Sequence, residues 1–78
     1  MKTVFENEII KVSKTGRDYD FIAVIENKRD KEIEIVFDDI DLEYNGIIVN
    51  ANDWVGLLAD YEGYFKLEEL EAERFTVI

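Results

Sequence analysis

The chain contains no cysteine, no histidine and no proline in its 78 residues. Without cysteine it can form no disulfide bond and can offer no thiolate to a metal ion. Without histidine it lacks the side chain that most often acts as a general base or a metal ligand near neutral pH. Nucleophilic pairs of the Ser-His or Cys-His kind are therefore excluded.

Glycine is also scarce, and its arrangement excludes the common phosphate-binding loops. The four glycines stand far apart, like turn residues, and match neither a P-loop nor a G-x-G-x-x-G pattern. Paired carboxylates hydrolyse glycosides in some enzymes, but that chemistry needs a concave cleft that sheds water, and so small a chain offers little room for one. We therefore expect a protein with no enzymatic activity, no catalytic residues and no cofactor.

Long apolar runs are missing as well. The first ten residues, MKTVFENEII, lack the apolar stretch of about 7–15 residues that a signal peptide requires. No apolar run approaches the roughly 20 residues of a membrane-spanning helix. Since the absence of cysteine also fits a reducing compartment, we expect a cytoplasmic protein that has no membrane partner.

Negative charge is what the chain has in excess. Its net charge is −10, and residues 32–73 carry thirteen Asp or Glu against the single cation Lys66. Residues 1–31 are nearly balanced, with seven Lys or Arg against six Asp or Glu. A field of this sign repels phosphate, so direct binding to DNA or RNA is not expected.

The apolar residues of the first half repeat mostly with a period of two, which is typical of β-strands. Ile10 and Val12 alternate with polar neighbours, residues 19–25 contain the unbroken run FIAVI of a central strand, and residues 32–37 alternate strictly. Polar turns at residues 15–18 and 27–31 separate these segments. The pattern predicts one domain over residues 1–78: mostly β, a small antiparallel β-sandwich or barrel with room for one short helix in the C-terminal half.

The stretch FDDIDLEYNGIIVNAN, residues 37–52, favours a hairpin. The alternation slips at Asp38-Asp39, which indicates a bulge or bend. Asn45-Gly46 then separates two apolar runs, residues 42–44 and 47–49. Such a pair predicts a type I′ turn, because both of its central positions need positive φ.

The same stretch also matches the beginning of an EF-hand calcium loop. Asp41-x-Glu43-x-Asn45-Gly46 places acidic or amide side chains at alternate positions and a glycine at the sixth. The twelfth position is Asn52, where a calcium loop needs a bidentate glutamate. We therefore prefer the hairpin and predict no specific metal site.

In the C-terminal part the sequence leaves the choice between helix and strand open. Residues 53–59 fit either a short helix after an Asn or Asp cap or another strand. Residues 64–67 and 74–78 are interpreted as two further β segments, whereas residues 68–73 have helical propensity, so that a short helix there is an alternative.

The phrase Ile25-Glu26-Asn27-Lys28-Arg29-Asp30-Lys31, followed by an alternating strand, a short strand and an N-G hairpin, resembles bacterial immunoglobulin-like β-sandwich modules. The resemblance covers about half of the chain. It implies a β-sandwich fold, and it makes a structural or adhesion module the alternative to the function considered next.

The acidic segment has two explanations. Its carboxylates are either the solvated face of a sheet, serving solubility, or a surface that attracts a basic partner. On one strand Asp39, Asp41 and Glu43 would lie roughly 6.6–6.8 Å apart on one face, in a regular anionic row. A groove built for nucleic acid would attract such a row.

Small acidic proteins without cofactors resemble, in type, phage-encoded inhibitors such as anti-CRISPR proteins and DNA mimics. That likeness implies an inhibitor of a basic, nucleic-acid-binding protein, acting in the host cytoplasm if a phage encodes it. The aromatic residues Trp54, Tyr61, Tyr64 and Phe65 belong either to the core or to such an interface. We predict a partner-binding surface that comprises Glu32, Glu34, Asp38, Asp39, Asp41, Glu43, Trp54 and Tyr61.

Overall fold

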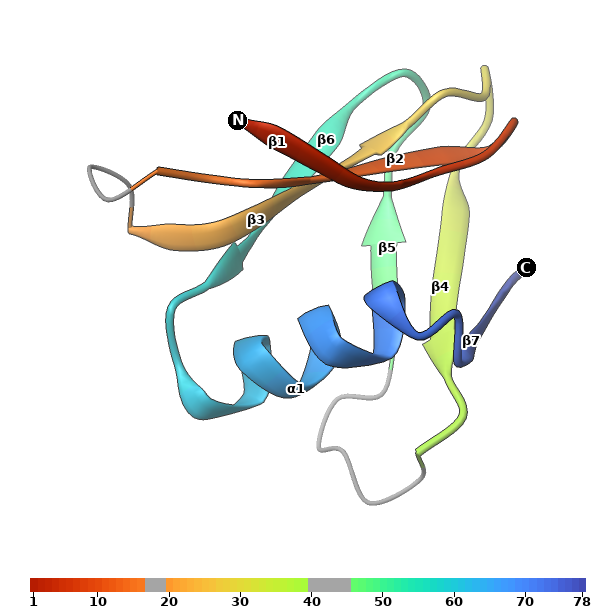
Figure 1. Ribbon diagram of the computed structural model, residues 1–78. Helices are drawn as coiled ribbons and strands as arrows, with labels where there is room; N and C mark the ends of the chain where they lie inside the picture. Colours follow the sequence, from red (N-terminus) through yellow and green to blue (C-terminus); the bar gives the residue numbers. More distant parts are fainter. Residues whose placement is uncertain (17–19, 40–45) are drawn as a thin grey trace.

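The structure of the protein is a computed structural model that describes residues 1–16, 20–39 and 46–78. Seven strands and one helix lie within these residues (Figure 1). Their bounds are β1 Lys2–Glu6, β2 Ile10–Lys14, β3 Phe21–Asn27, β4 Ile33–Phe37, β5 Ile47–Val49, β6 Trp54–Leu58, α1 Tyr61–Glu71 and β7 Phe75–Val77.

The strands form two antiparallel sheets, so the prediction of a mostly β, antiparallel fold with one C-terminal helix is confirmed. The first sheet has the order β1-β2-β3-β6 and the second the order β5-β4-β7. In Figure 1 the first sheet crosses the upper part of the molecule, the strands of the second run steeply below it, and α1 lies beside both. Successive strands are neighbours from β1 to β3 and again for β4 and β5, whereas β6 and β7 pair with strands formed much earlier in the chain.

Strands β3 and β4 follow directly from the sequence pattern. In β3, which lies between β2 and β6, Ala23, Val24 and Ile25 are all buried, whereas Glu26 is exposed on the outward face. In β4, Ile33 and Ile35 are buried while Glu34 between them is half-buried on the opposite face. Both strands agree with the predicted central run and the predicted alternation.

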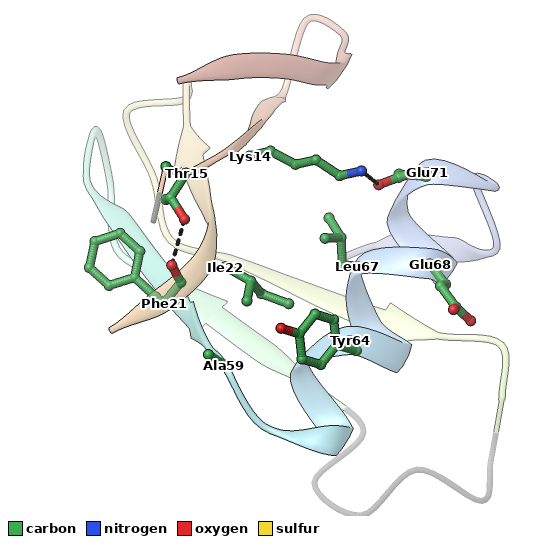
Figure 2. Close-up of a pocket in the computed structure, with 10 residues that line it drawn as sticks. Lys14, Thr15, Phe21, Ile22, Ala59, Tyr64, Leu67, Glu68 and Glu71 are labelled. Carbon is green, nitrogen blue, oxygen red and sulfur yellow. Dashed lines mark hydrogen bonds and ion pairs between the residues drawn. The ribbon is translucent and has the colours of Figure 1, made fainter. Parts of the chain in front are cut away.

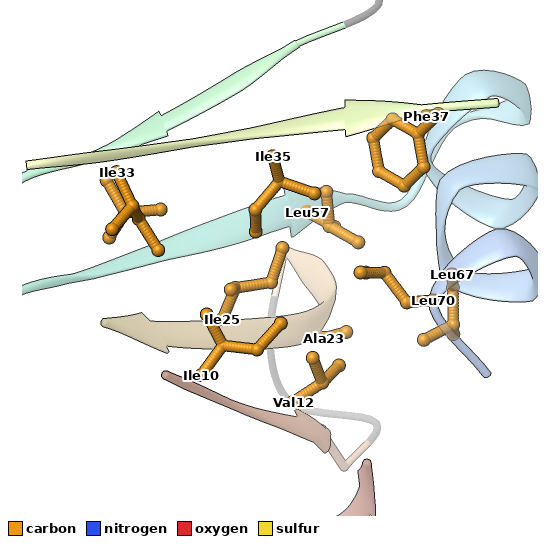
Figure 3. Packing of buried hydrophobic residues seen from close by; sticks show 11 residues of the cluster. Ile10, Val12, Ala23, Ile25, Ile33, Ile35, Phe37, Leu57, Leu67 and Leu70 are labelled. Atoms are coloured by element: carbon orange, nitrogen blue, oxygen red, sulfur yellow. The ribbon is translucent and has the colours of Figure 1, made fainter. Parts of the chain in front are cut away.

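The hydrophobic core lies between the two sheets, and α1 closes one end of it (Figure 3). Ile10, Val12 and Ile25 contribute from the first sheet and face Ile33 and Ile35 of the second. The helix adds Leu67 and Leu70, which are 7% and 0% exposed. Complete burial of each large aliphatic side chain contributes about 1.5–3 kcal/mol, so this cluster is the main source of stability.

The helix α1 shows that the predicted β segment at residues 64–67 is wrong. Asp60 caps the helix, with its side chain accepting a hydrogen bond from the Gly63 N–H at 2.7 Å. Gly63, Leu67 and Leu70 are buried at the spacing of one helical face. A strand would have placed Leu67 and Leu70 on opposite faces, so burial of both against the core favours the helix.

Three other strands bear on the sequence-based predictions: one resolves an open alternative, one confirms a prediction and one was not predicted. Residues 54–58, which fitted either a helix or a strand, form β6. The β segment expected at residues 74–78 is confirmed as β7, which pairs with β4. The first strand, β1, was not predicted, because its apolar residues Val4 and Phe5 are adjacent and do not alternate with polar ones. In the structure its pairing with β2 shifts register between Thr3 and Phe5.

Asn45 of the predicted turn and the apolar run at residues 42–44 lie outside the described residues, whereas Gly46 is described and directly precedes β5. The structure does show that Ile47–Val49 pairs antiparallel with β4, with Ile33 opposite Val49 and Ile35 opposite Ile47. No helix in the described ranges is long and apolar enough to cross a membrane.

Candidate functional site

The outward face of α1 carries aromatic and acidic side chains. Tyr61, Tyr64, Glu68 and Glu71 are exposed and recur at helical spacing, opposite the face that packs on the core. Tyr61 is 79% exposed and its ring meets Phe65 edge to face at 4.6 Å between centroids. Tyr64 is 55% exposed. Tyr61 and Tyr64 are therefore largely on the surface, whereas Phe65 is half-buried.

Beside this helix lies a hollow of about 690 Å³ between α1 and the adjoining ends of β2 and β3. Ile22, Tyr64 and Leu67 project into the space between the strands and the helix in Figure 2. Lys14 of β2 reaches across to Glu71 at the end of the helix, with 3.1 Å between Nζ and Oε1. Glu68 lies on the helical side of the rim.

The end of β3 beside the hollow is held by the side chain of Thr15. Its Oγ1 donates a hydrogen bond to the Phe21 carbonyl at 2.5 Å, and the Thr15 N–H donates to the Ile22 carbonyl at 3.1 Å. On the helical side, the Asp60 cap sets where α1 begins and thus where Tyr64 lies. Each wall of the hollow is therefore positioned by local hydrogen bonds.

A second aromatic pair, of which Trp54 is exposed and Phe21 half-buried, lies on the outward face of the first sheet. Gly56 of β6 has no side chain, and Phe21 fills that space; a Cβ at Gly56 would lie 2.9 Å from Phe21 Cγ. The Phe21 ring is thereby brought to 6.0 Å from the ring of Trp54, which is 53% exposed. The exposed side chain of Glu26 stands opposite Trp54 on β3.

The acidic residues of the predicted surface are spread along β4. Glu32 precedes the strand and is exposed, Glu34 lies on its outward face, and Asp38 follows the strand and is exposed. Asp39 is half-buried. Asp41 and Glu43, and with them the anionic row expected from Asp39 to Glu43, lie outside the described residues.

Asp38 lies near one end of the helix, where charges gather around Arg74. The Asp38 N–H donates to the Arg74 carbonyl at 3.1 Å. The guanidinium of Arg74 donates two hydrogen bonds of 2.9 Å to the carboxylate of Glu69, which is 8% exposed. These hydrogen bonds and the charge of Glu69 raise the pKa of Arg74, and the charges of Glu68 and Asp38 act in the same direction. Arg74 is thus a structural cation that holds a buried carboxylate.

The structure does not gather the predicted binding residues into one patch. Trp54 lies on the outward face of the first sheet, Glu34 on that of the second, and Tyr61 on the helix. No sequence motif pointed to Phe21, Lys14 or Glu68. A glycine inside an apolar strand, Gly56, signals close approach of another group and could have pointed to Phe21. The Lys14–Glu71 contact is tertiary and has no local signal.

Within residues 1–16, 20–39 and 46–78, no three acidic side chains converge in a way that would hold a metal ion. Of the EF-hand positions, Asn52 is exposed with φ of 53°, and the residues from Asp41 to Asn45 are outside the described ranges. Comparison with protein-family models, with curated proteins and with solved structures found no match to this chain.

Proposed function

We propose that this protein is a non-enzymatic acidic binding protein that inhibits a basic, nucleic-acid-binding protein. The inhibitor would be of the DNA-mimic or anti-CRISPR type: its carboxylates would occupy the groove in which the partner normally holds phosphates. The distribution of charge supports this proposal most directly.

From residue 32 onward, the two cations Lys66 and Arg74 both form ion pairs within the protein. Lys66 lies 3.4 Å from Glu62, and Arg74 is bound to Glu69. Glu32, Asp38, Glu68 and Glu73 are exposed, and none of them forms an ion pair within the part of the chain that the structure describes. Solubility alone would be served by mixed charges, whereas this surface is kept anionic at the cost of self-repulsion.

The exposed aromatic side chains add a second kind of support. Tyr61, Tyr64 and Trp54 are each more than half exposed. Interfaces are enriched in Tyr and Trp at the positions that contribute most to binding, because these rigid side chains bury large areas. A surface that carries both carboxylates and exposed aromatic rings therefore fits a protein partner better than a surface that carries carboxylates alone.

The alternative function, a structural or adhesion module of the immunoglobulin-like type, has less support. The immunoglobulin order places the first, second, fifth and fourth strands in one sheet. Here β3 pairs with β2 and β6, and β4 lies between β5 and β7.

The test is capture of proteins from a host lysate on the immobilised protein, at low and at high salt, with and without duplex DNA as a competitor. We expect capture of nucleic-acid-binding proteins, which DNA and high salt release. Raising the salt concentration from 0.1 M to 1 M shortens the Debye length from about 10 Å to about 3 Å.

A charge-neutralised variant makes this test specific. Asp38, Asp39, Asp41 and Glu43 are replaced by Asn or Gln, and the matched control carries the same replacement at Glu8, Asp20, Glu26 and Asp30. Association should slow in the first variant and change little in the control, since charges at the rim of an interface act mainly through the association rate. Equal capture by both variants at low salt would leave the acidic segment as a solvated surface only.

A further inference from the structure

The hollow beside α1 combines an apolar floor, an aromatic wall and a carboxylate rim. Ile22 and Leu67 form part of the floor and Tyr64 stands at the wall. Glu68 and Glu71 lie on the rim. These are the groups that an arginine or lysine side chain uses, because its methylene stem packs on apolar atoms while its charged end meets an aromatic face or a carboxylate.

Within the described residues, the cation that lines this hollow is Lys14, and it comes from the protein itself. Its Nζ lies 3.1 Å from Oε1 of Glu71, and the two side chains are 48% and 40% exposed. An exposed pair of this kind contributes only about 0–1 kcal/mol, so it exchanges readily with another cation. Glu68 on the same rim has no ion pair within the described part of the chain.

The net charge decides which occupant fits. A second copy of this chain would bring a charge of −10 against another of −10, which disfavours self-association through the acidic half. A basic protein has the complementary charge. Resting on the function proposed above, we infer that the hollow is the docking point for a cationic side chain of the basic partner, carried on an apolar segment, and that Lys14 occupies the place of that side chain until the partner binds.

This arrangement predicts opposite effects for two substitutions on the same hollow. Lys14→Gln removes the internal competitor and leaves Glu71 available, so binding should tighten. Glu68→Gln removes a rim carboxylate, so binding should weaken. Charges on the rim should contribute to binding about as much as an exposed ion pair contributes to stability. Each substitution should therefore change Kd about two- to fivefold.

Matched controls separate a local effect from a change in net charge. Lys28 forms an exposed pair with Glu6 at 3.2 Å, so Lys28→Gln changes the charge as Lys14→Gln does but at a place away from the hollow. Glu8 is exposed, so Glu8→Gln is the corresponding control for Glu68→Gln. Thermal melting of all four variants should stay close to that of wild type, because these exposed charges contribute little to stability.

The probe is a synthetic amphipathic peptide with arginine and leucine along one helical face. Its binding is measured by calorimetry and by the amide chemical shifts of the protein. A second peptide, with serine in place of leucine, carries the same charge. We expect the leucine peptide to bind more tightly, with shifts centred on Ile22, Tyr64 and Leu67.

Each result has a defined meaning. If Lys14→Gln and Lys28→Gln bind the leucine peptide alike, or if both peptides bind equally, the hollow is not the docking point. Should the charge-neutralised variant at the same time lose binding while the hollow variants keep it, the proposed function stands and only this inference fails. If neither peptide binds to any form of the protein, the hollow is not the docking point, and the capture experiment described above decides separately whether the proposed function stands.

Discussion

Replacement of Asn27 should destabilise the protein more than replacement of any exposed polar residue, because this side chain joins two distant turns. Asn27 ends β3 and is 3% exposed. Its Nδ2 donates to the carbonyl oxygens of Lys31 at 2.8 Å, Val49 at 3.1 Å and Asn50 at 3.1 Å. Its Oδ1 accepts a hydrogen bond from the Arg29 N–H at 2.9 Å. One amide group therefore holds the turn after β3 against the end of β5.

The magnitude follows from these four contacts. A hydrogen bond contributes about 0.5–1.5 kcal/mol net, and a buried partner left unsatisfied costs about 1–3 kcal/mol. The Nδ2 group has only two hydrogens for its three acceptors, so one N–H is shared between two carbonyl oxygens. Asn27→Ala removes these contacts and leaves the Val49 carbonyl without this donor, so a loss of about 3 kcal/mol in the free energy of unfolding is expected. Since small domains are stable by only about 5–15 kcal/mol, this is a large fraction of the total.

The variant Asn27→Asp distinguishes the contribution of the Nδ2 donor from that of the Oδ1 acceptor. The aspartate keeps one oxygen for the Arg29 N–H but turns its second oxygen, instead of two N–H groups, toward three carbonyl oxygens. We expect this variant to be at least as unstable as Asn27→Ala, although its shape is nearly that of wild type. A suitable control is Asn7→Ala, since the exposed Asn7 accepts hydrogen bonds from the N–H groups of Ile9 and Ile10 at 2.8 and 2.9 Å. That control should cost only about 1 kcal/mol.

The assay is urea unfolding followed by circular dichroism and by the fluorescence of Trp54. A midpoint that falls with an unchanged slope reports a change in stability alone. A loss below about 1 kcal/mol for Asn27→Ala, or an Asn27→Asp variant as stable as wild type, would refute the view that this amide joins the two turns.

Two further predictions concern the ends of α1. Gly63→Ala should lower stability by about 1–3 kcal/mol in a melting experiment, because the added Cβ would lie 2.0 Å from the Leu58 carbonyl oxygen. Gly16→Ala, with no atom within 4 Å of the new Cβ, should change little, and a stabilised Gly63→Ala would contradict the close approach of helix and strand. Glu73→Gly should raise stability by about 1 kcal/mol, because Glu73 follows the helix with φ of 58°, where glycine is unstrained. Glu73→Gln removes the charge alone, so a gain equal to that of Glu73→Gly would assign the effect to the helix dipole instead of the backbone.

Local sequence patterns are sufficient to identify the buried faces of several strands, and the composition alone shows that thiol and imidazole side chains are missing. Ile33, Ile35 and Phe37 alternate with polar or half-buried neighbours because successive strand side chains point to opposite faces, and this local rule needs no tertiary information. The unbroken apolar run from Phe21 to Ile25 likewise identified a central strand, which is flanked by β2 and β6. The concentration of carboxylates after residue 31 is also a property of the sequence alone.

Which strands are neighbours and where the hollow lies depend on tertiary packing. A period of two specifies a buried face but not the partner strand, so the pairing of β3 with β6 and of β4 with β7 could not be deduced. Residues 64–67 have aromatic side chains that suit a strand, but packing of Leu67 and Leu70 on the core, together with the Asp60 cap, stabilises a helix. The hollow depends on contacts between β2, β3 and α1. Lys14 and Glu71 are 57 positions apart in the chain and meet at 3.1 Å only because the helix folds back onto the sheet, and a contact of that kind has no signature in local sequence.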